Sequence, residues 1–409
     1  MIATGLRLEN FRSYRTLELK FGPGVNVFSG HNAQGKTNIL EAIYICSCAR
    51  SHRTARDQEL IFRGASAYSI ELDYTLANGT EESIKLQYGT QSPDGRPSNE
   101  RRFWHNRIRQ ERIADLYGLF NAVIFAPEDL MLVKEGPIAR RRFLDLLLAQ
   151  IRPRYFAALQ RFNRILKQRN QLLKRLRDQQ PMTGSGAFIA RPDLALDYAL
   201  LDAWDEQYAD LMAELIGDRF ELTGRIRERA AVYHSLISGD RETLDIRYRT
   251  MSGLKPEQSS EERCSLIRRR LEQLRRDDIV RGTTSIGAHR DDLDLRLDEQ
   301  PLKLFGSQGQ QRTAVLAMKL AELAVFRDLT GQTPVLLLDD VMSELDRRRR
   351  QALIAAMRDC QVMLTCTDTE QVQEELRELA GGQPLSFFHV DCSQVTALDT
   401  PGGVPGDTD

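Results

Sequence analysis

The segment GHNAQGKT, from Gly30 to Thr37, has residue types and a spacing suited to binding the phosphates of a nucleotide. It fits the pattern G-x-x-x-x-G-K-[ST], in which glycines let backbone N–H groups converge on phosphate oxygens. Lys36 would supply a positive charge to the β- and γ-phosphates, and Thr37 would supply a hydroxyl to Mg²⁺. The predicted phosphate loop also contains His31, Asn32, Ala33, Gln34 and Gly35.

A second segment, PVLLLDDVMSELD, places two carboxylates directly after a run of apolar residues. Such a run predicts a strand buried on both faces, and its carboxyl end lies at the sheet edge where open α/β folds bind ligands. We expect Asp339 to hold Mg²⁺, directly or through water, and Asp340 to orient or deprotonate the attacking water. A buried strand that ends in a polar loop would look the same, but its pairing with the phosphate loop favours catalysis. The predicted catalytic residues are Lys36, Asp339 and Asp340.

A third segment, GSQGQQRT, precedes a long amphipathic pattern and has a serine flanked by glycines. Ser307 with Gly309 at the start of a helix favours a second anion site, because first-turn N–H groups and the helix dipole point toward the ligand. Ser307 and Gln310 also fit the S-x-x-Q capping box, so helix initiation alone would explain both residues.

Together, these segments resemble the RecF family of ABC-type ATPases, DNA-repair relatives of the SMC proteins and of RecN. Residues 307–310 resemble the S-G-G-Q signature of ABC-type ATPases, and SELD at 343–346 resembles their D-loop. Further matching segments are RSHR at 50–53, FAPEDL at 125–130 and GAHRDDL at 287–293.

The resemblance implies an α/β fold, an ABC-type ATPase head with an inserted, mainly α-helical hairpin lobe. It also implies that ATP and Mg²⁺ bind between two protomers of a homodimer, with Ser307, Gly309 and Gln310 of one facing the phosphate loop of the other. The resemblance also implies that Arg12 and Glu128 lie near the nucleotide. The implied partners are single-stranded, gapped or junction DNA and mediator proteins of the RecO and RecR type. The implied role is recombinase loading in repair and replication restart, with SOS induction.

Three positions depart from the patterns of related ATPases. Asp340 stands where most ABC-type relatives have the longer Glu, and Thr367 stands where they have a switch histidine. Both departures predict slow hydrolysis, so we expect a weak, DNA-dependent ATPase. Ala288 stands where the RecF family usually has proline, which leaves the roles of His289 and Arg290 open.

The elements that would position these residues follow from periodicity. Period-two alternation predicts strands in IATGLRL, in YRTLELKF and on both sides of Asn78-Gly79, a hairpin signal. GVNVFSG leads into the phosphate loop as a strand, and residues 38–49 follow it at helical spacing. Strand-like segments return at LDLRL, PVLLLDDV, QVMLTC and SFFHV.

The middle of the chain predicts long helices instead. Apolar residues from Tyr155 and from Leu201 recur at three-four spacing, and DQQPMTGSGAFIARP between them predicts the turn of an antiparallel hairpin. We therefore expect an N-terminal part of the head at 1–124, a helical lobe at 125–282 and the rest of the head at 283–409. The final residues, DTPGGVPGDTD, predict a frayed end.

Charge is distributed unevenly although the net charge is only −1. Residues 101–177 hold 18 Lys and Arg against 6 Asp and Glu, a local excess typical of proteins that bind the phosphate backbone. Within it, Phe103 and Trp104 in RRFWHNRIRQER would stack on unpaired bases or point into the core. The run at Arg140–Arg142 would contact DNA or form a solvated helix face.

The composition argues against a membrane-spanning protein, and three alternative functions have to be compared with the resemblance. The chain has no apolar run long enough to cross a membrane and no paired C-x-x-C spacing, so we expect a cytoplasmic protein with reduced thiols. Three other functions stay open: an SMC- or RecN-like structural clamp on DNA, a P-loop kinase, and an ABC subunit of a transporter. The clamp would need longer coiled coils, the kinase would lack a second anion site, and the transporter subunit would leave the helical hairpin unexplained.

Overall fold

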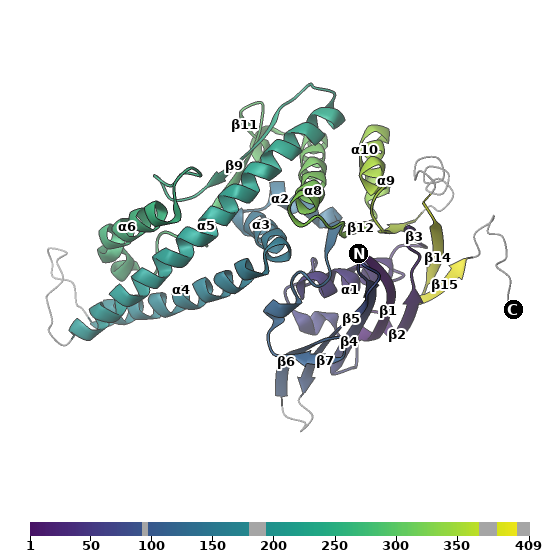
Figure 1. The fold of residues 1–409 in the computed structure, drawn as a ribbon, viewed down its shortest axis with the longest axis horizontal. Helices are drawn as coiled ribbons and strands as arrows, with labels where there is room; N and C mark the ends of the chain where they lie inside the picture. Colours follow the sequence, from purple (N-terminus) through teal and green to yellow (C-terminus); the bar gives the residue numbers. More distant parts are fainter. Residues whose placement is uncertain (92–96, 180–193, 368–382, 399–409) are drawn as a thin grey trace. The chain divides into compact units, whose positions relative to one another are not determined.

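The computed structural model describes residues 1–91, 97–179, 194–367 and 383–398 (Figure 1). The turn predicted around residues 178–192 lies almost entirely outside these residues, and so does the predicted frayed end at 399–409. The chain forms two compact units. The first comprises Met1–Met131, Arg229–Leu244 and Gly306–Asp409, and the second comprises Leu132–Glu228 and Asp245–Phe305.

The first unit contains an antiparallel sheet with the strand order β2-β1-β4-β5-β6-β7. Its strands are β1 (Ile2–Phe11), β2 (Tyr14–Lys20), β4 (Ala67–Thr75), β5 (Glu81–Gln91), β6 (Pro97–His105) and β7 (Ile108–Gln110). The hairpin predicted at Asn78-Gly79 is confirmed, since β4 and β5 pair from Thr75 opposite Glu81 and Gly79 takes a φ of 83°. Short η1 (Asp57–Leu60) and η2 (Ile113–Leu116) lie in the same unit.

A second sheet of the first unit has the order β15-β14-β3-β13-β12-β8. Its strands are β3 (Val25–Ser29), β8 (Ala122–Phe125), β12 (Val335–Asp339), β13 (Val362–Cys366), β14 (Leu385–Asp391) and β15 (Gln394–Leu398). All pairs except β14–β15 are parallel. Every residue of β3, β12 and β13 is buried, which confirms the burial that the apolar run of β12 predicted.

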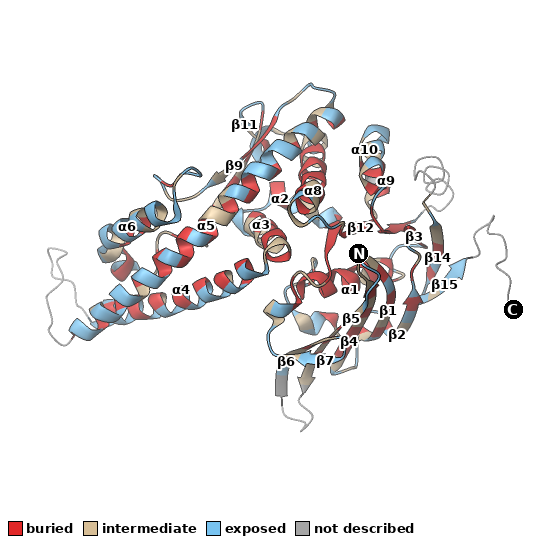
Figure 2. Ribbon diagram, viewed as in Figure 1, coloured by how far each residue is buried: buried red, intermediate tan, exposed pale blue. Residues whose placement is uncertain are grey.

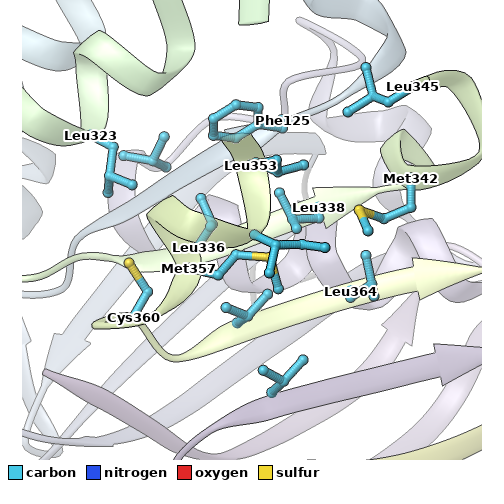
Figure 3. Packing of buried hydrophobic residues seen from close by; sticks show 14 of the residues in the cluster. Phe125, Leu323, Leu336, Leu338, Met342, Leu345, Leu353, Met357, Cys360 and Leu364 are labelled. Atoms are coloured by element: carbon cyan, nitrogen blue, oxygen red, sulfur yellow. The ribbon is translucent and has the colours of Figure 1, made fainter. Parts of the chain in front are cut away.

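Helices complete the first unit around this parallel sheet: α1 (Lys36–Cys48), η3 (Pro127–Leu130), α8 (Gln308–Thr330), α9 (Val341–Glu344) and α10 (Arg347–Met357). Apolar side chains from α8, α9 and α10 meet those of the sheet in one core, where Leu323 and Leu353 lie near Leu336 and Leu338 (Figure 3). This core holds α8, α9 and α10 against the parallel sheet.

The second unit is mainly helical. It contains α3 (Pro137–Ile151), α4 (Pro153–Gln179), α6 (Ser260–Arg281), α7 (Leu302–Phe305), most of α5 (Ala195–Ser238) and a sheet of β9 (Leu244–Arg249), β10 (Asp292–Leu297) and β11 (Gln300–Pro301). The four-residue α2 (Met131–Lys134) leads into it. The two long helices predicted from Tyr155 and Leu201 are confirmed, and Leu173 of α4, Leu201 of α5 and Ile279 of α6 share one apolar cluster.

Buried polar side chains also organise the second unit. Arg169 of α4 is fully buried and donates to Asp205 (2.6 Å) and Asp278 (2.8 Å). His289 follows Ala288, whose carbonyl accepts a hydrogen bond from Arg219 (2.6 Å). Burial, with neighbouring Arg290 acting in the same direction, lowers the pKa of His289 to about 4. These contacts give the segment at 287–293 a structural role inside the second unit.

The unit boundaries differ from those predicted at 125 and 282. Residues 283–305 belong to the second unit, because the strand predicted at LDLRL forms β10 beside β9 and β11. Residues 229–244 belong to the first unit, where Ile237 joins the core of the parallel sheet. The sequence pattern indicated each strand but not its partner.

The structure also bears on membrane-spanning helices and on the cysteines. Within the described ranges, no helix combines the length and apolar character needed to cross a membrane. Four of the six cysteines are buried and all six are free, with Cys264 half-buried and Cys392 exposed.

Candidate nucleotide-binding site

The phosphate loop joins β3 to α1 in a conformation that requires both of its glycines. Gly30 has a φ of 148°, and a Cβ there would lie 2.2 Å from the carbonyl oxygen of Val390. Gly35 has a φ of 112°, and a Cβ would lie 2.7 Å from the hydroxyl of Tyr14. The strand–loop–helix context that the pattern needs is therefore present.

Between these glycines the loop is open to solvent. His31, Asn32 and Ala33 are exposed, while the side chain of Gln34 accepts a hydrogen bond from the backbone N–H of Cys392 (2.6 Å). The turn between β14 and β15 thus holds one side of the loop. The exposed loop and the N-terminus of α1 can receive an anion from solvent.

Lys36 lies over the loop that precedes it. Its Nζ donates to the carbonyl oxygens of Gly30 (2.6 Å) and His31 (2.8 Å), and the residue is 7% exposed. Burial lowers the pKa of the Lys36 ammonium, and the nearby carboxylate of Asp340 opposes that shift. The ammonium is therefore held where phosphate oxygens would meet it.

Asp339 and Thr37 meet at the carboxyl edge of the parallel sheet. The Thr37 hydroxyl donates to Oδ1 of Asp339 (2.8 Å), and so does the hydroxyl of Thr365 (2.9 Å). The sheet register explains this, since Asp339 pairs with Thr365 on the neighbouring strand β13. Burial raises the pKa of Asp339, and the two hydroxyl donors oppose the shift.

These oxygens fit a magnesium ion bound together with a nucleotide. Mg²⁺ prefers oxygen ligands and in phosphate-transfer sites takes one or two carboxylates with substrate phosphates and water. No group of three or more His, Cys, Asp or Glu side chains in the described ranges could hold a metal ion. Thr37 and Asp339 therefore suit a cation whose coordination the nucleotide completes.

Asp340 has an unusual backbone conformation for a non-glycine residue, with a φ of 50°. Its N–H donates to the Thr365 hydroxyl (2.8 Å), and its carboxylate accepts from Ser343 in the D-loop segment (3.1 Å). A left-handed aspartate at a strand end is a place where local strain accompanies function. The carboxylate also lies close enough to act on the pKa of Lys36.

Arg12 and Glu128 lie in the same unit, but their side chains have other partners. The Arg12 guanidinium binds both oxygens of the fully buried Glu41 (2.7 and 2.8 Å) and the carbonyl oxygen of Glu59 (2.9 Å). Glu128 is exposed, 3.9 Å from Arg53, and close enough to Asp339 to raise its pKa. Their contact with a nucleotide stays a prediction.

The segment predicted as a second anion site caps a helix. The Ser307 hydroxyl accepts from the Gln310 N–H (3.3 Å), and the Gln310 side chain accepts from the Ser307 N–H (2.6 Å). The capping box is thus confirmed, and it leaves the N–H groups of Gln308 and Gly309 at the start of α8 without an intrahelical acceptor. No interaction in the described chain joins this turn to the phosphate loop.

Two residues that the sequence motifs did not indicate hold this turn in place. The Gln310 amide donates to Glu242 (2.7 Å). Arg349 of α10 donates to the carbonyl oxygen of Gly309 (2.9 Å) and to the hydroxyl of Thr313 (2.7 Å). No local pattern reveals these contacts, because the partners are far apart in sequence. Glu41 was detectable as the one carboxylate in the otherwise apolar run ILEAIYICSC.

The basic segments mostly have internal partners. Phe103 is 1% exposed and lies in the core, and Arg101 pairs with Asp57. Arg140 is buried against Asp292 (2.7 Å), and Arg141 donates to the carbonyl oxygen of Asp291 (2.7 Å). The prediction that Arg140–Arg142 contacts DNA or forms a solvated face was wrong for these two arginines, because each bonds within the second unit.

Comparison with known proteins identifies the family. The model of the RecF/RecN/SMC N terminal domain matches residues 2–382. A DNA replication and repair protein RecF from Ruminiclostridium cellulolyticum is 39% identical over 370 residues, which make up 90% of this chain and 94% of the relative.

Solved structures agree with this assignment. The recombination mediator protein RecF-ATP in the RecFOR pathway is similar with a TM-score of 0.85 at 29% identity, covering 97% of this chain and 98% of that one. The Smc head domain with an extended coiled coil from Pyrococcus furiosus, bound to the C-terminal domain of ScpA, has a TM-score of 0.51 at 16% identity, covering 97% and 96%. The latter shows the fold alone, and both confirm the predicted α/β, ABC-type ATPase fold. The chain therefore belongs to the RecF family.

Proposed function

We propose that this protein is an ATP-binding DNA replication and repair protein that dimerises with ATP on DNA and hydrolyses ATP slowly. One observation carries the proposal: the phosphate-binding half of a site, at Lys36, Thr37 and Asp339, is assembled in the first unit without Ser307. In a second turn, at Ser307–Gln310, the N–H groups of Gln308 and Gly309 have no intrahelical acceptor and are available for the nucleotide of another molecule.

In this function each residue of the phosphate-binding half has a separate task. Backbone N–H groups of the loop and the Lys36 ammonium bind the phosphates, and the Lys36 charge stabilises the negative charge that develops during transfer. When bound, Mg²⁺ neutralises phosphate charge, and Thr37 and Asp339 would hold it. Thr365 orients Asp339 through its hydroxyl, and it accepts the N–H of Asp340.

Hydrolysis requires a water molecule positioned for in-line attack. Asp340 would accept a proton from this water, and its short side chain, already hydrogen-bonded to Ser343, limits its reach. Thr367 is exposed directly after β13 and cannot supply an imidazole. Both features support slow turnover, which suits a dimer whose lifetime on DNA is set by hydrolysis.

The role in repair rests on the family. Relatives are named DNA replication and repair proteins, and a similar solved protein is a recombination mediator of the RecFOR pathway. We infer that gapped, single-stranded or junction DNA and proteins of the RecO and RecR type are partners here. Recombinase loading and SOS induction in the cytoplasm would follow from such partners.

The test is ATP-dependent dimerisation of the wild type and of Ser307→Arg, measured by sedimentation with Mg²⁺ and a slowly hydrolysed ATP analogue. The variant should bind nucleotide normally and remain monomeric, because a bulky cation replaces the capping serine at the second anion site. A dimer of undiminished affinity would refute the role given to Ser307.

A matched control separates loss of a helix cap from loss of the anion site. Ser259 caps α6 with the same geometry. Its hydroxyl accepts from the backbone N–H of Glu262, and the Glu262 carboxylate accepts from the backbone N–H of Ser259. Ser259→Arg should therefore lose about 1 kcal/mol of cap stability but keep dimerisation. DNA-stimulated ATPase measured on gapped, single-stranded and duplex DNA tests the proposed partner.

A further inference from the structure

The solvent face of α4 carries no carboxylate along almost its whole length. From Pro153 to Arg177 the helix has eight Lys and Arg and no Asp or Glu, and Asp178 is its first acidic residue. A solvated helix face normally mixes both signs of charge. Neighbouring α5 does so, with exposed carboxylates that pair with arginines, as Glu221 pairs with Arg225.

Some of the basic residues on α4 have structural partners. Arg169 is buried with its carboxylates, Arg175 pairs with Asp197 (3.0 Å), and Arg177 pairs with Asp178 (2.9 Å). The side chains of Lys174 and Arg177 both lie beside Gly282 at the end of α6, where the helix dipole favours cations. Arg169, Arg175 and Arg177 thus have carboxylate partners, and Lys174 has a favourable position at a helix end.

Four others remain. Arg154, Arg161, Arg164 and Lys167 are all exposed, and the described part of the chain gives none of their side chains a hydrogen bond or ion pair. Arg154 lies in the first turn of α4, which has no acidic residue and where a cation opposes the helix dipole. Helix stability therefore does not explain it. We call these four residues the α4 basic face.

Helical geometry places the α4 basic face on one side. The four residues recur at spacings of seven, three and three, so at 3.6 residues per turn they fall within an arc of about 140°. The buried Phe162, Ile165 and Leu172 border this arc on the side of Arg154 and Arg161. In Figure 2 the exposed and buried residues of α4 separate into two stripes along the helix. From Arg154 to Lys167 the face is about 20 Å long at 1.5 Å per residue.

Beside these cations α4 also exposes neutral side-chain amides. Gln160, Asn163, Gln168 and Gln171 are exposed or half-buried on α4, and none carries a negative charge. Duplex DNA carries one negative charge per 1.7 Å of its axis, so about 20 Å of helix meets many phosphates. Arginines, lysines and side-chain amides are the groups that bind phosphate oxygens without reading sequence.

We propose that the α4 basic face is the surface with which the second unit contacts the phosphate backbone of DNA. This inference rests on the proposed function, since it assumes that the protein binds DNA. It locates the contact on one helix of the basic segment, because Arg101, Arg140 and Arg141 of that segment are already bonded internally. Binding through this face depends on salt and not on base sequence.

The test replaces all four residues of the α4 basic face with Gln in the full-length chain. Affinity for a fluorescent gapped DNA is measured with ATP over a range of salt concentrations. Each lost phosphate contact reduces the slope of log affinity against log salt by about 0.9, so the quadruple variant should be shallower by about 3 to 4. Nucleotide binding and the unfolding transition should stay as in the wild type.

The matched control makes the same charge change on α6 of the same unit, by replacing Arg268, Arg269, Arg270 and Arg276, all exposed, with Gln. This control should retain the wild-type slope. An unchanged slope in the α4 variant, or an equal loss in both variants, overturns the inference while leaving DNA binding intact. A wild type that binds no DNA overturns the proposed function itself.

Discussion

Replacing Arg349 tests whether the first turn of α8 must be ordered for the protein to dimerise with ATP. Its guanidinium makes two hydrogen bonds to the Thr313 hydroxyl (2.7 and 3.0 Å) and one to the carbonyl oxygen of Gly309 (2.9 Å). Its side chain is only 18% exposed, so these bonds are partly shielded from water. Arg349→Ala removes all three and leaves the capping box itself unchanged.

The magnitude follows from these contacts. Hydrogen bonds from charged groups contribute about 1.5 to 3 kcal/mol when their partners are buried. Because the Arg349 side chain is partly exposed, we use the lower value, about 1.5 kcal/mol, as the free energy with which Arg349 orders the first turn of one α8. A symmetric dimer would use two such turns, so dimerisation should weaken by about 3 kcal/mol, or about 100-fold in Kd. Arg349→Lys keeps the charge but loses the planar fork, and about a tenfold loss is expected.

Two measurements check the Arg349 prediction. Sedimentation with Mg²⁺ and a slowly hydrolysed ATP analogue gives the dimer constant, and hydrogen exchange reports opening of the first turn of α8. Arg358→Ala is the control, because Arg358 is exposed at the end of α10 and its side chain has no partner among the described residues. Wild-type dimerisation and exchange in Arg349→Ala would refute the positioning role.

Three further predictions concern catalysis, stability and pH. Asp340→Asn should reduce phosphate release at least 100-fold while ATP-dependent dimerisation persists, and a variant that hydrolyses normally would exclude Asp340 as the base. Arg169→Met should lower the free energy of unfolding by about 3 to 5 kcal/mol in urea, because the fully buried carboxylate of Asp278 loses its cation, whereas Asp205 keeps its ion pair with Arg275; a loss below 1 kcal/mol would contradict this. The low pKa of His289, about 4, means that the unfolded chain takes up its proton first, so stability falls as pH falls from about 6.5 towards 4. Between pH 7 and 5 the loss should be about 2 kcal/mol, and His289→Gln should be flatter by that amount.

Local sequence patterns determined much of the phosphate-binding half of the site. The phosphate loop, the buried strand before Asp339 and the Ser307 capping box each depend on residues close together in sequence, and all three are present. The hairpin at Asn78-Gly79 and the long helices were predictable for the same reason. In each, short-range backbone geometry and periodic burial set the conformation.

Pairing between distant segments was not predictable from these patterns. The strand at 292–297 had the expected alternation, but only tertiary contacts decided that it joins β9 and β11 in the second unit. The arginines at 140 and 141 read as a charged surface run, yet Arg140 is buried against Asp292, 152 residues away. A run of arginines in the sequence shows where positive charges lie along the chain. Whether an arginine is buried depends on whether the fold brings a carboxylate next to it.

The same distinction between local patterns and tertiary contacts applies to the candidate site. The sequence by itself determined the chemistry of Lys36, Thr37 and Asp339, because a phosphate loop and a strand-end carboxylate are local features. Only the tertiary structure placed Thr37 against Asp339, 302 residues apart, through the order of three parallel strands. It also decided that Glu41 binds Arg12 and that Arg349 holds the start of α8, because such contacts exist only once distant elements have packed together.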